Sequence, residues 1–176
     1  VYIRGEGGGA ILNRNGKLRK LNLKNANMIS SSVYYGFSPS GKYVTFSSNI
    51  IIPAFHANAD KRQEVYDSKS DVYVADLDNN RIISSPLTSD STHLETFPTF
   101  SPDGKYVYYC AADRKGLEST NLKGLKYSLV RIPFDEKTGS FGTNIDTLYK
   151  ERSACHPKIS PDGRYCLFTV ADYGTF

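Results

Sequence analysis

The stretch that decides the fold is TFSPDGKYVYY at Thr99 to Tyr109, which recurs as GFSPSGKYVTF at Gly36 to Phe46 and KISPDGRYCLF at Lys158 to Phe168. The prolines of the three copies are spaced 63 and 59 residues apart, at Pro39, Pro102 and Pro161. A fixed period of this size is typical of a repeat architecture rather than of one irregular domain.

Each copy predicts a short strand, a tight turn and a longer strand. In the turn, proline presets φ, Asp or Ser at the next position forms a local hydrogen bond, and glycine accepts a positive φ. The residues that we assign to these turns are Pro39, Gly41, Pro102, Asp103, Gly104, Pro161, Asp162 and Gly163. The strand after the turn is apolar on both faces, which is typical of a strand that neighbouring sheets cover on both sides.

Two further strands are predicted between successive copies. After the first copy they are Asp71 to Leu77 and Arg81 to Leu87, and after the second they are Tyr127 to Phe134 and Asn144 to Tyr149. Four strands per period predict an all-β fold, a β-propeller of four-stranded antiparallel blades.

The chain has too few repeats for a closed propeller, which needs about four to eight blades. We expect about three blades' worth: the end of a preceding blade at residues 1–23, complete blades at 24–88 and 89–151, and the first half of another at 152–176. Since the chain also lacks an initiator Met, we expect it to be a piece of a longer protein.

The F-S-P-D-G-K-Y motif, followed by an aromatic strand and then by DVYVADL at Asp71 to Leu77, resembles the repeat of TolB-like propellers. The resemblance covers nearly the whole chain from Tyr34 onward. The family it indicates includes WD-repeat-like periplasmic proteins of Bacteroidetes. Ser40 stands where the family has Asp. It implies a periplasmic or outer-membrane-associated bacterial protein with a protein partner in the cell envelope, or a glycan or peptide ligand. The same repeat occurs in prolyl-oligopeptidase-like serine peptidases, where it carries no catalytic residue.

Composition and charge exclude two classes of partner. No apolar run is long enough to span a bilayer. The net charge is +4, and the basic residues of the first 24 positions are interpreted as protection of an outer edge strand rather than as a nucleic-acid surface.

Sequence motifs for catalysis, cofactors and metals are lacking. Gly5 to Ala10 matches the GxGxxA fingerprint, but Asn15-Gly16 predicts a hairpin where that fingerprint requires a helix, so the glycines are interpreted as a flexible connection. No nucleophile elbow, HExxH or phosphate loop occurs. Cys110 and Cys166 are interpreted as core residues, and no cysteine pair has the spacing of a metal site. We therefore predict no catalytic residues, no cofactor and no metal.

The two ends of the blades differ in their connections. One end, the turn rim, carries the repeated turns, whereas the other, the loop rim, carries the long connections Asn49 to Ser70, Thr88 to Thr96 and Asp113 to Lys126. Long connections in a compact domain are commonly functional. The candidate binding residues are Phe55, His56, Arg62, Tyr66, His93 and His156. A metal site of the three histidines with Cys155 is an alternative, although they lack ligand spacing.

Three hypotheses for the function follow. The first is a non-enzymatic TolB-like propeller that binds a protein, or an envelope ligand, through the loop rim. The second is the gating propeller of a prolyl-oligopeptidase-like serine hydrolase whose catalytic domain lies outside these residues. The third is an architectural module of an envelope assembly.

Overall fold

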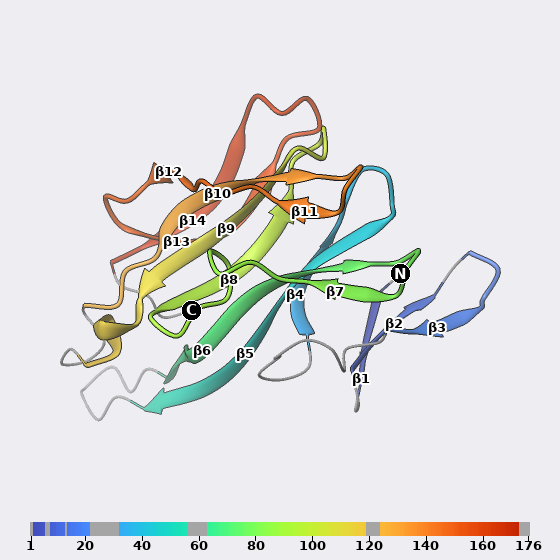
Figure 1. Cartoon of the computed structure of the whole chain (residues 1–176). Coiled ribbons are helices and arrows are strands. Elements are labelled where there is room, and N and C mark those ends of the chain that lie inside the picture. The colour runs from blue at the N-terminus through green and yellow to red at the C-terminus, as the bar shows by residue number, and fades with distance from the viewer. Residues whose placement is uncertain are drawn as a thin grey trace.

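The computed structural model describes residues 2–5, 8–12, 14–21, 32–55, 63–118 and 124–172 as antiparallel sheets that stand side by side (Figure 1). The first sheet has the order β1-β2-β3 and contains β1 (Tyr2–Gly5), β2 (Gly8–Leu12) and β3 (Leu18–Lys20). Gly8 and Gly9, expected in a flexible connection, instead lie in β2 and pair with Gly5 and Arg4. A hairpin follows them rather than a helix, which excludes the dinucleotide-binding interpretation.

The next two sheets are complete meanders of four strand positions. One contains β4 (Ser32–Phe37), β5 (Tyr43–Phe55), β6 (Gln63–Asp76) and β7 (Arg81–Ile83), in that order. The other contains β8 (His93–Phe100), β9 (Tyr106–Asp113) and β10 (Ser128–Asp135), with β11 (Ser140–Phe141) and β12 (Asp146–Tyr149) both paired to β10. The fourth strand of this sheet is thus divided into two short segments.

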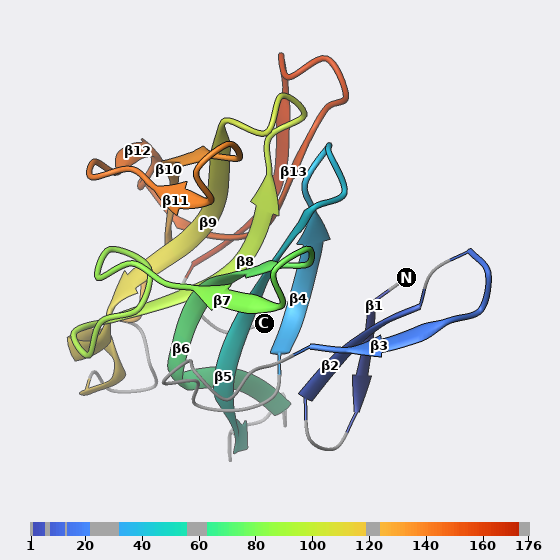
Figure 2. The same cartoon turned by 45° about the vertical axis from the view of Figure 1, so that its right-hand side comes forward.

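A two-stranded sheet of β13 (Ser153–Ile159) and β14 (Cys166–Ala171) follows. The sheets are blades of a β-propeller, so the predicted fold class is confirmed. In both views the first strands β4, β8 and β13 lie next to one another on the inner side of the arc, and β7 and β11 lie outside (Figure 2). No helix among the described residues is long and apolar enough to cross a membrane.

The sheets are held together because alternate residues of one strand pack in different cores. In β6, Val72 and Val74 pack with Val107 and Ile132 of the next blade, whereas Tyr73 lies in the core on the opposite face. All residues from 43 to 49 in β5 are buried. The expectation of a strand covered on both faces is therefore confirmed for this strand.

The repeated turns form one hydrogen-bond pattern three times. In the second copy, Gly104 N donates to Ser101 O, Tyr106 N donates to Ser101 Oγ, and Ser101 Oγ donates to Asp103 Oδ1. The glycines of the three turns have φ of 70°, 72° and 72°, a left-handed conformation that only glycine adopts without strain. Ser40 replaces the aspartate of the other copies, and its Oγ accepts the bond from Lys42 N. All three turns lie at the same end of the sheets (Figure 2).

Two expected connections differ from the structure. The segment from Asn49 to Ser70 is mostly strand, since β5 and β6 stay paired out to Phe55 and Gln63. Its β-branched and aromatic residues suit a strand better than a loop. The strand expected over Arg81 to Leu87 stops at Ile83, because the chain turns at Ser85, where Ser85 O accepts from Thr88 N.

Candidate functional site

The loop rim carries an apolar patch on a projecting hairpin. Beyond Asn49, β5 and β6 extend past the neighbouring blades (Figure 1). Ile50, Ile51 and Ile52 lie on this extension and are 41, 44 and 38% exposed. We name these three residues the isoleucine patch. Since side chains alternate along a strand, Ile50 and Ile52 point to one face of the hairpin and Ile51 to the other, so a partner that encloses the hairpin can displace water from both faces.

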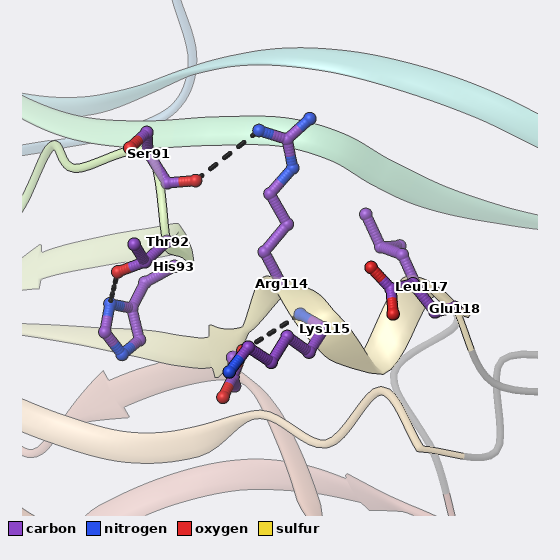
Figure 3. Close-up of a pocket in the computed structure, with 8 residues that line it drawn as sticks. Ser91, Thr92, His93, Arg114, Lys115, Leu117 and Glu118 are labelled. Atoms are coloured by element: carbon purple, nitrogen blue, oxygen red, sulfur yellow. Dashed lines mark hydrogen bonds between the residues drawn. The ribbon is translucent and has the colours of Figure 1, made fainter.

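A groove lies beside the hairpin on the same rim. Its volume is about 680 Å³, and Figure 3 shows its wall, formed by residues 91–93 on one side and by the 3-10 helix η1 (Arg114–Glu118) on the other. Arg114 reaches across, and its Nη1 donates to Ser91 O at 3.5 Å. The walls mix hydroxyl, imidazole, carboxylate and basic groups with Leu117 and the apolar stems of long side chains, so the groove suits a peptide segment that has both polar and apolar groups.

His93 lies at the edge of the groove and belongs to a cluster with two carboxylates. Its Nδ1 is 2.9 Å from Asp90 Oδ2, and one ligand atom each from Asp90, His93 and Glu95 lies within 4.8 Å of the others. Asp90 Oδ1 accepts hydrogen bonds from the backbone N–H groups of Thr92 and His93. Burial opposes ionisation of Asp90, yet the hydrogen bonds from His93 and Thr92 hold its pKa below the usual value.

Glu95 is the deepest member of this cluster. It is 2% exposed, and its Oε2 is buried without a hydrogen-bond partner. Burial, together with the charges of Asp90 and Asp71, raises the pKa of Glu95 to about 9. A carboxylate in such a place is costly unless it holds a proton or a cation.

A second buried carboxyl lies nearer the hairpin. Asp67 is fully buried and accepts a 2.7 Å hydrogen bond from Asn49 Nδ2 at its Oδ1, while its Oδ2 has no partner. Burial raises its pKa to about 6, against the opposing effect of the hydrogen bond from Asn49. Asp67 is thus neutral in acid and charged at physiological pH.

The inner face carries a repeated cluster of rings. Tyr34, Phe97 and His156 occupy the same position in the first strands of three blades, and all have positive φ, from 49° to 55°. The register shifts at each of these positions, which is the mark of a β-bulge. The ring centroid of Phe97 lies 4.5 Å from that of Tyr34 and 3.9 Å from that of His156. Burial, and secondarily Lys158, lowers the pKa of His156.

The predicted binding residues that the structure describes, His93, Tyr66 and His156, have different surroundings. His93 lines the groove, whereas Tyr66 is half-buried against the apolar cluster that contains Phe97, and His156 stacks on Phe97. Among the described residues, the cluster that includes His93 contains neither His156 nor Cys155. His56 and Arg62 lie outside the described residues, as does the side chain of Phe55.

Sequence reasoning missed Asp90 and Glu95. A signal for Glu95 was present, because it is a lone charge within the strand HLETFPTF, which is otherwise apolar or neutral after His93. It also missed the ring cluster, although the pairs Phe97-Pro98 and His156-Pro157 precede their motifs by the same spacing. In the first copy Tyr35 takes the place of the proline.

Comparison with known proteins identifies the type of propeller to which this fold is similar. No family model matches the chain. A structure described as a TolB from Agrobacterium tumefaciens is similar to it, with a TM-score of 0.53 and 18% identity over 93% of this chain and 50% of that one. At this identity the likeness shows the fold alone, and the chain has a TolB-like β-propeller fold.

Peptidases contain similar segments. The chain is 38% identical over 56 residues to dipeptidyl-peptidase 5 of Porphyromonas endodontalis, which is 32% of this chain and 8% of that protein. Dipeptidyl peptidase 4 of Porphyromonas gingivalis is similar in structure, with a TM-score of 0.50 and 10% identity over 88% of this chain and 26% of that one. The chain thus spans half or less of each of these relatives.

Proposed function

We propose that the chain is the protein-binding part of a TolB-like propeller of the bacterial cell envelope and that it binds its partner at the loop rim. The isoleucine patch would supply the apolar contact, and the groove beside it would take a polar segment of the partner. The turn rim would serve the fold only.

The exposed isoleucine patch carries this proposal. Three adjacent isoleucines exposed on a projecting hairpin are costly to leave in water, and burial of each against a partner would contribute about 1 kcal/mol. The groove adds hydroxyl and charged groups beside the patch, in the arrangement of an apolar centre with a polar rim.

Photocrosslinking in the native cell tests this proposal. A photoreactive residue at Ile51 of the full-length protein is expected to capture one envelope protein, and Ile52→Ser is expected to reduce that capture at least tenfold. Leu148, which is 44% exposed on the outer strand β12, is the matched control position and is expected to capture none. Equal capture at both positions would refute the assignment to the loop rim.

The gating propeller of a serine peptidase is the second candidate. It is favoured by the 56-residue match to dipeptidyl-peptidase 5 and by the similar structure of dipeptidyl peptidase 4. In that case the rim would admit peptides to a catalytic domain encoded elsewhere in the same gene.

The complete gene and one labelling reaction separate the two candidates. A serine-directed fluorophosphonate is expected to leave the full-length protein unlabelled if it is a binding protein. Labelling at a serine within a Gly-x-Ser-x-Gly elbow would instead support the peptidase and overturn the first proposal.

A further inference from the structure

We propose that Asp90, His93 and Glu95 form a binding site for one divalent transition-metal ion, best matched by Zn²⁺, between the connection from β7 to β8 and the start of β8. Each residue offers one ligand atom, and these atoms lie within 4.8 Å of one another. This inference goes beyond the proposed protein partner, although His93 also lines the groove that the partner would occupy.

The unpartnered carboxylate oxygen of Glu95 is the independent observation behind this site. Glu95 is 2% exposed, and its Oε2 has no hydrogen bond. Among the described residues no lysine or arginine forms an ion pair with Asp90 or Glu95; the recorded pair is His93 with Asp90. A cation would compensate both carboxylates at once.

The donor atoms favour a transition metal over calcium or magnesium. Two carboxylates and one imidazole are typical ligands of Zn²⁺, whereas Ca²⁺ and Mg²⁺ prefer sites made of oxygen alone. Three protein ligands leave one position of a tetrahedral ion for water or another ligand. His93 also lines the groove, so the site can be reached from the surface.

The same arrangement gives the metal a structural effect. Asp90 lies on the connection that follows β7, whereas His93 and Glu95 lie on β8. A shared ion would therefore fix this connection to the strand. Binding of the ion would raise the free energy of unfolding. Once the metal concentration exceeds the dissociation constant, this increase grows with the logarithm of the concentration.

Calorimetric titration of the chelator-treated, reduced protein with Zn²⁺ tests this site. The wild type is expected to bind one ion, and Glu95→Gln is expected to weaken binding at least tenfold. Glutamine keeps the shape of the side chain and is neutral, which burial favours, so this variant is expected to remain folded. His93→Gln removes a second proposed ligand and is also expected to weaken Zn²⁺ binding. His156→Gln is the control and is expected to bind Zn²⁺ like the wild type.

Thermal unfolding gives a second readout. Zn²⁺ is expected to raise the Tm of the wild type and of His156→Gln, and to leave the Tm of Glu95→Gln unchanged. Absence of Zn²⁺ binding in the wild type would overturn the proposal. Equal binding by the wild type, Glu95→Gln and His93→Gln would also overturn it, because the ion would then lie elsewhere.

Discussion

The repeated turns and the loop side of the blades differ in how completely their polar side chains are paired. At the turn rim, the hydroxyls of Ser101 and Ser160 each accept a backbone N–H and donate to an aspartate. Toward the loop rim, Asp67 Oδ2, Ser70 Oγ and Glu95 Oε2 are buried without hydrogen bonds, whereas at the turn end this holds for Glu136 Oε1, which lies outside the repeated turns beside Gly104. Since an unpaired buried polar atom costs about 1 to 3 kcal/mol, the loop side is less stable than its strand pairing alone would make it.

This difference agrees with the proposed division, in which the repeated turns serve folding and the loop rim serves binding. A group selected only for stability is expected to be paired, as at the turns, and local departures from that rule are commonest at functional sites. The pKa values of one aspartate on each side of the blades shift in opposite directions. Burial raises the pKa of Asp67, whereas the pKa of Asp103 is lowered, chiefly by its hydrogen bond from Ser101.

The largest expected effect is that of Asp67→Asn on the pH dependence of stability. Because its pKa is higher in the folded state, the folded protein binds more protons between about pH 4 and 6, and its free energy of unfolding falls as pH rises through this window. A shift of about two pKa units corresponds to a loss on the order of 3 kcal/mol by pH 7. Asp67→Asn is expected to remove this loss in urea unfolding at pH 4 and pH 7.

Asp103→Asn is the control for that experiment and is expected to act in the opposite direction. Its native carboxylate has a lowered pKa, so it contributes stability above its unfolded pKa that is lost in acid. The variant is expected to lose stability at pH 7 and little at low pH. Identical pH profiles for the wild type and Asp67→Asn would contradict the contrast between the rims.

The next effect concerns the backbone at the turn rim. Gly41 has a φ of 70° and open space around its missing Cβ, so Gly41→Ala is expected to cost about 1 to 2 kcal/mol through backbone strain alone. Gly36 lies five residues earlier, and an added Cβ there meets atoms no closer than 3.6 Å. Gly36→Ala is the matched control, expected to be nearly neutral in urea unfolding. Equal losses would mean that the turn geometry is not limiting.

A pair of serine substitutions then compares the rims directly. Ser101→Ala is expected to cost about 1 kcal/mol, because Tyr106 N and Asp103 each lose a hydrogen bond. Ser70→Ala is expected to cost nothing or to stabilise, because its buried Oγ has no partner to lose. Thermal unfolding of the two variants in parallel measures the difference, and the reverse order would refute the comparison.

The smallest effect on stability is expected at the isoleucine patch. Ile51 is 44% exposed, so Ile51→Ser is expected to change the free energy of unfolding by less than about 0.5 kcal/mol. Capture of the envelope partner is nevertheless expected to fall. A large loss of stability would show that the patch packs on its own blade rather than on a partner.

The repeat predicted the fold because its turn chemistry is local. Proline, glycine and a short polar side chain determine the turn, and the double-sided apolar pattern determines the buried strand. The sequence predicts a loop at Ile50 to Ile52, where the structure has an extended hairpin. These residues pair with residues 66–69, and this contact between two segments is not evident from the sequence.

The candidate site was less accessible to prediction. His93 was selected, but its association with Asp90 depends on a turn in which Asp90 Oδ1 accepts from two backbone N–H groups. The burial of Glu95 depends on the packing of a neighbouring blade. The alternative grouping of His93 with His156 is not found among the described residues, where His156 stacks on Phe97 of the adjacent first strand.

The left-handed bulge in the first strand of each blade brings side chains of neighbouring blades into contact. Each of three successive blades contributes one side chain, Tyr34, Phe97 or His156, to the inner wall at the same height. Phe97 is 3% exposed and packs between the other two rings, so this row of bulges joins the first strands of neighbouring blades. Glycine or asparagine tolerates this backbone conformation, so either could replace a ring residue and weaken the contact between blades without reshaping the strands.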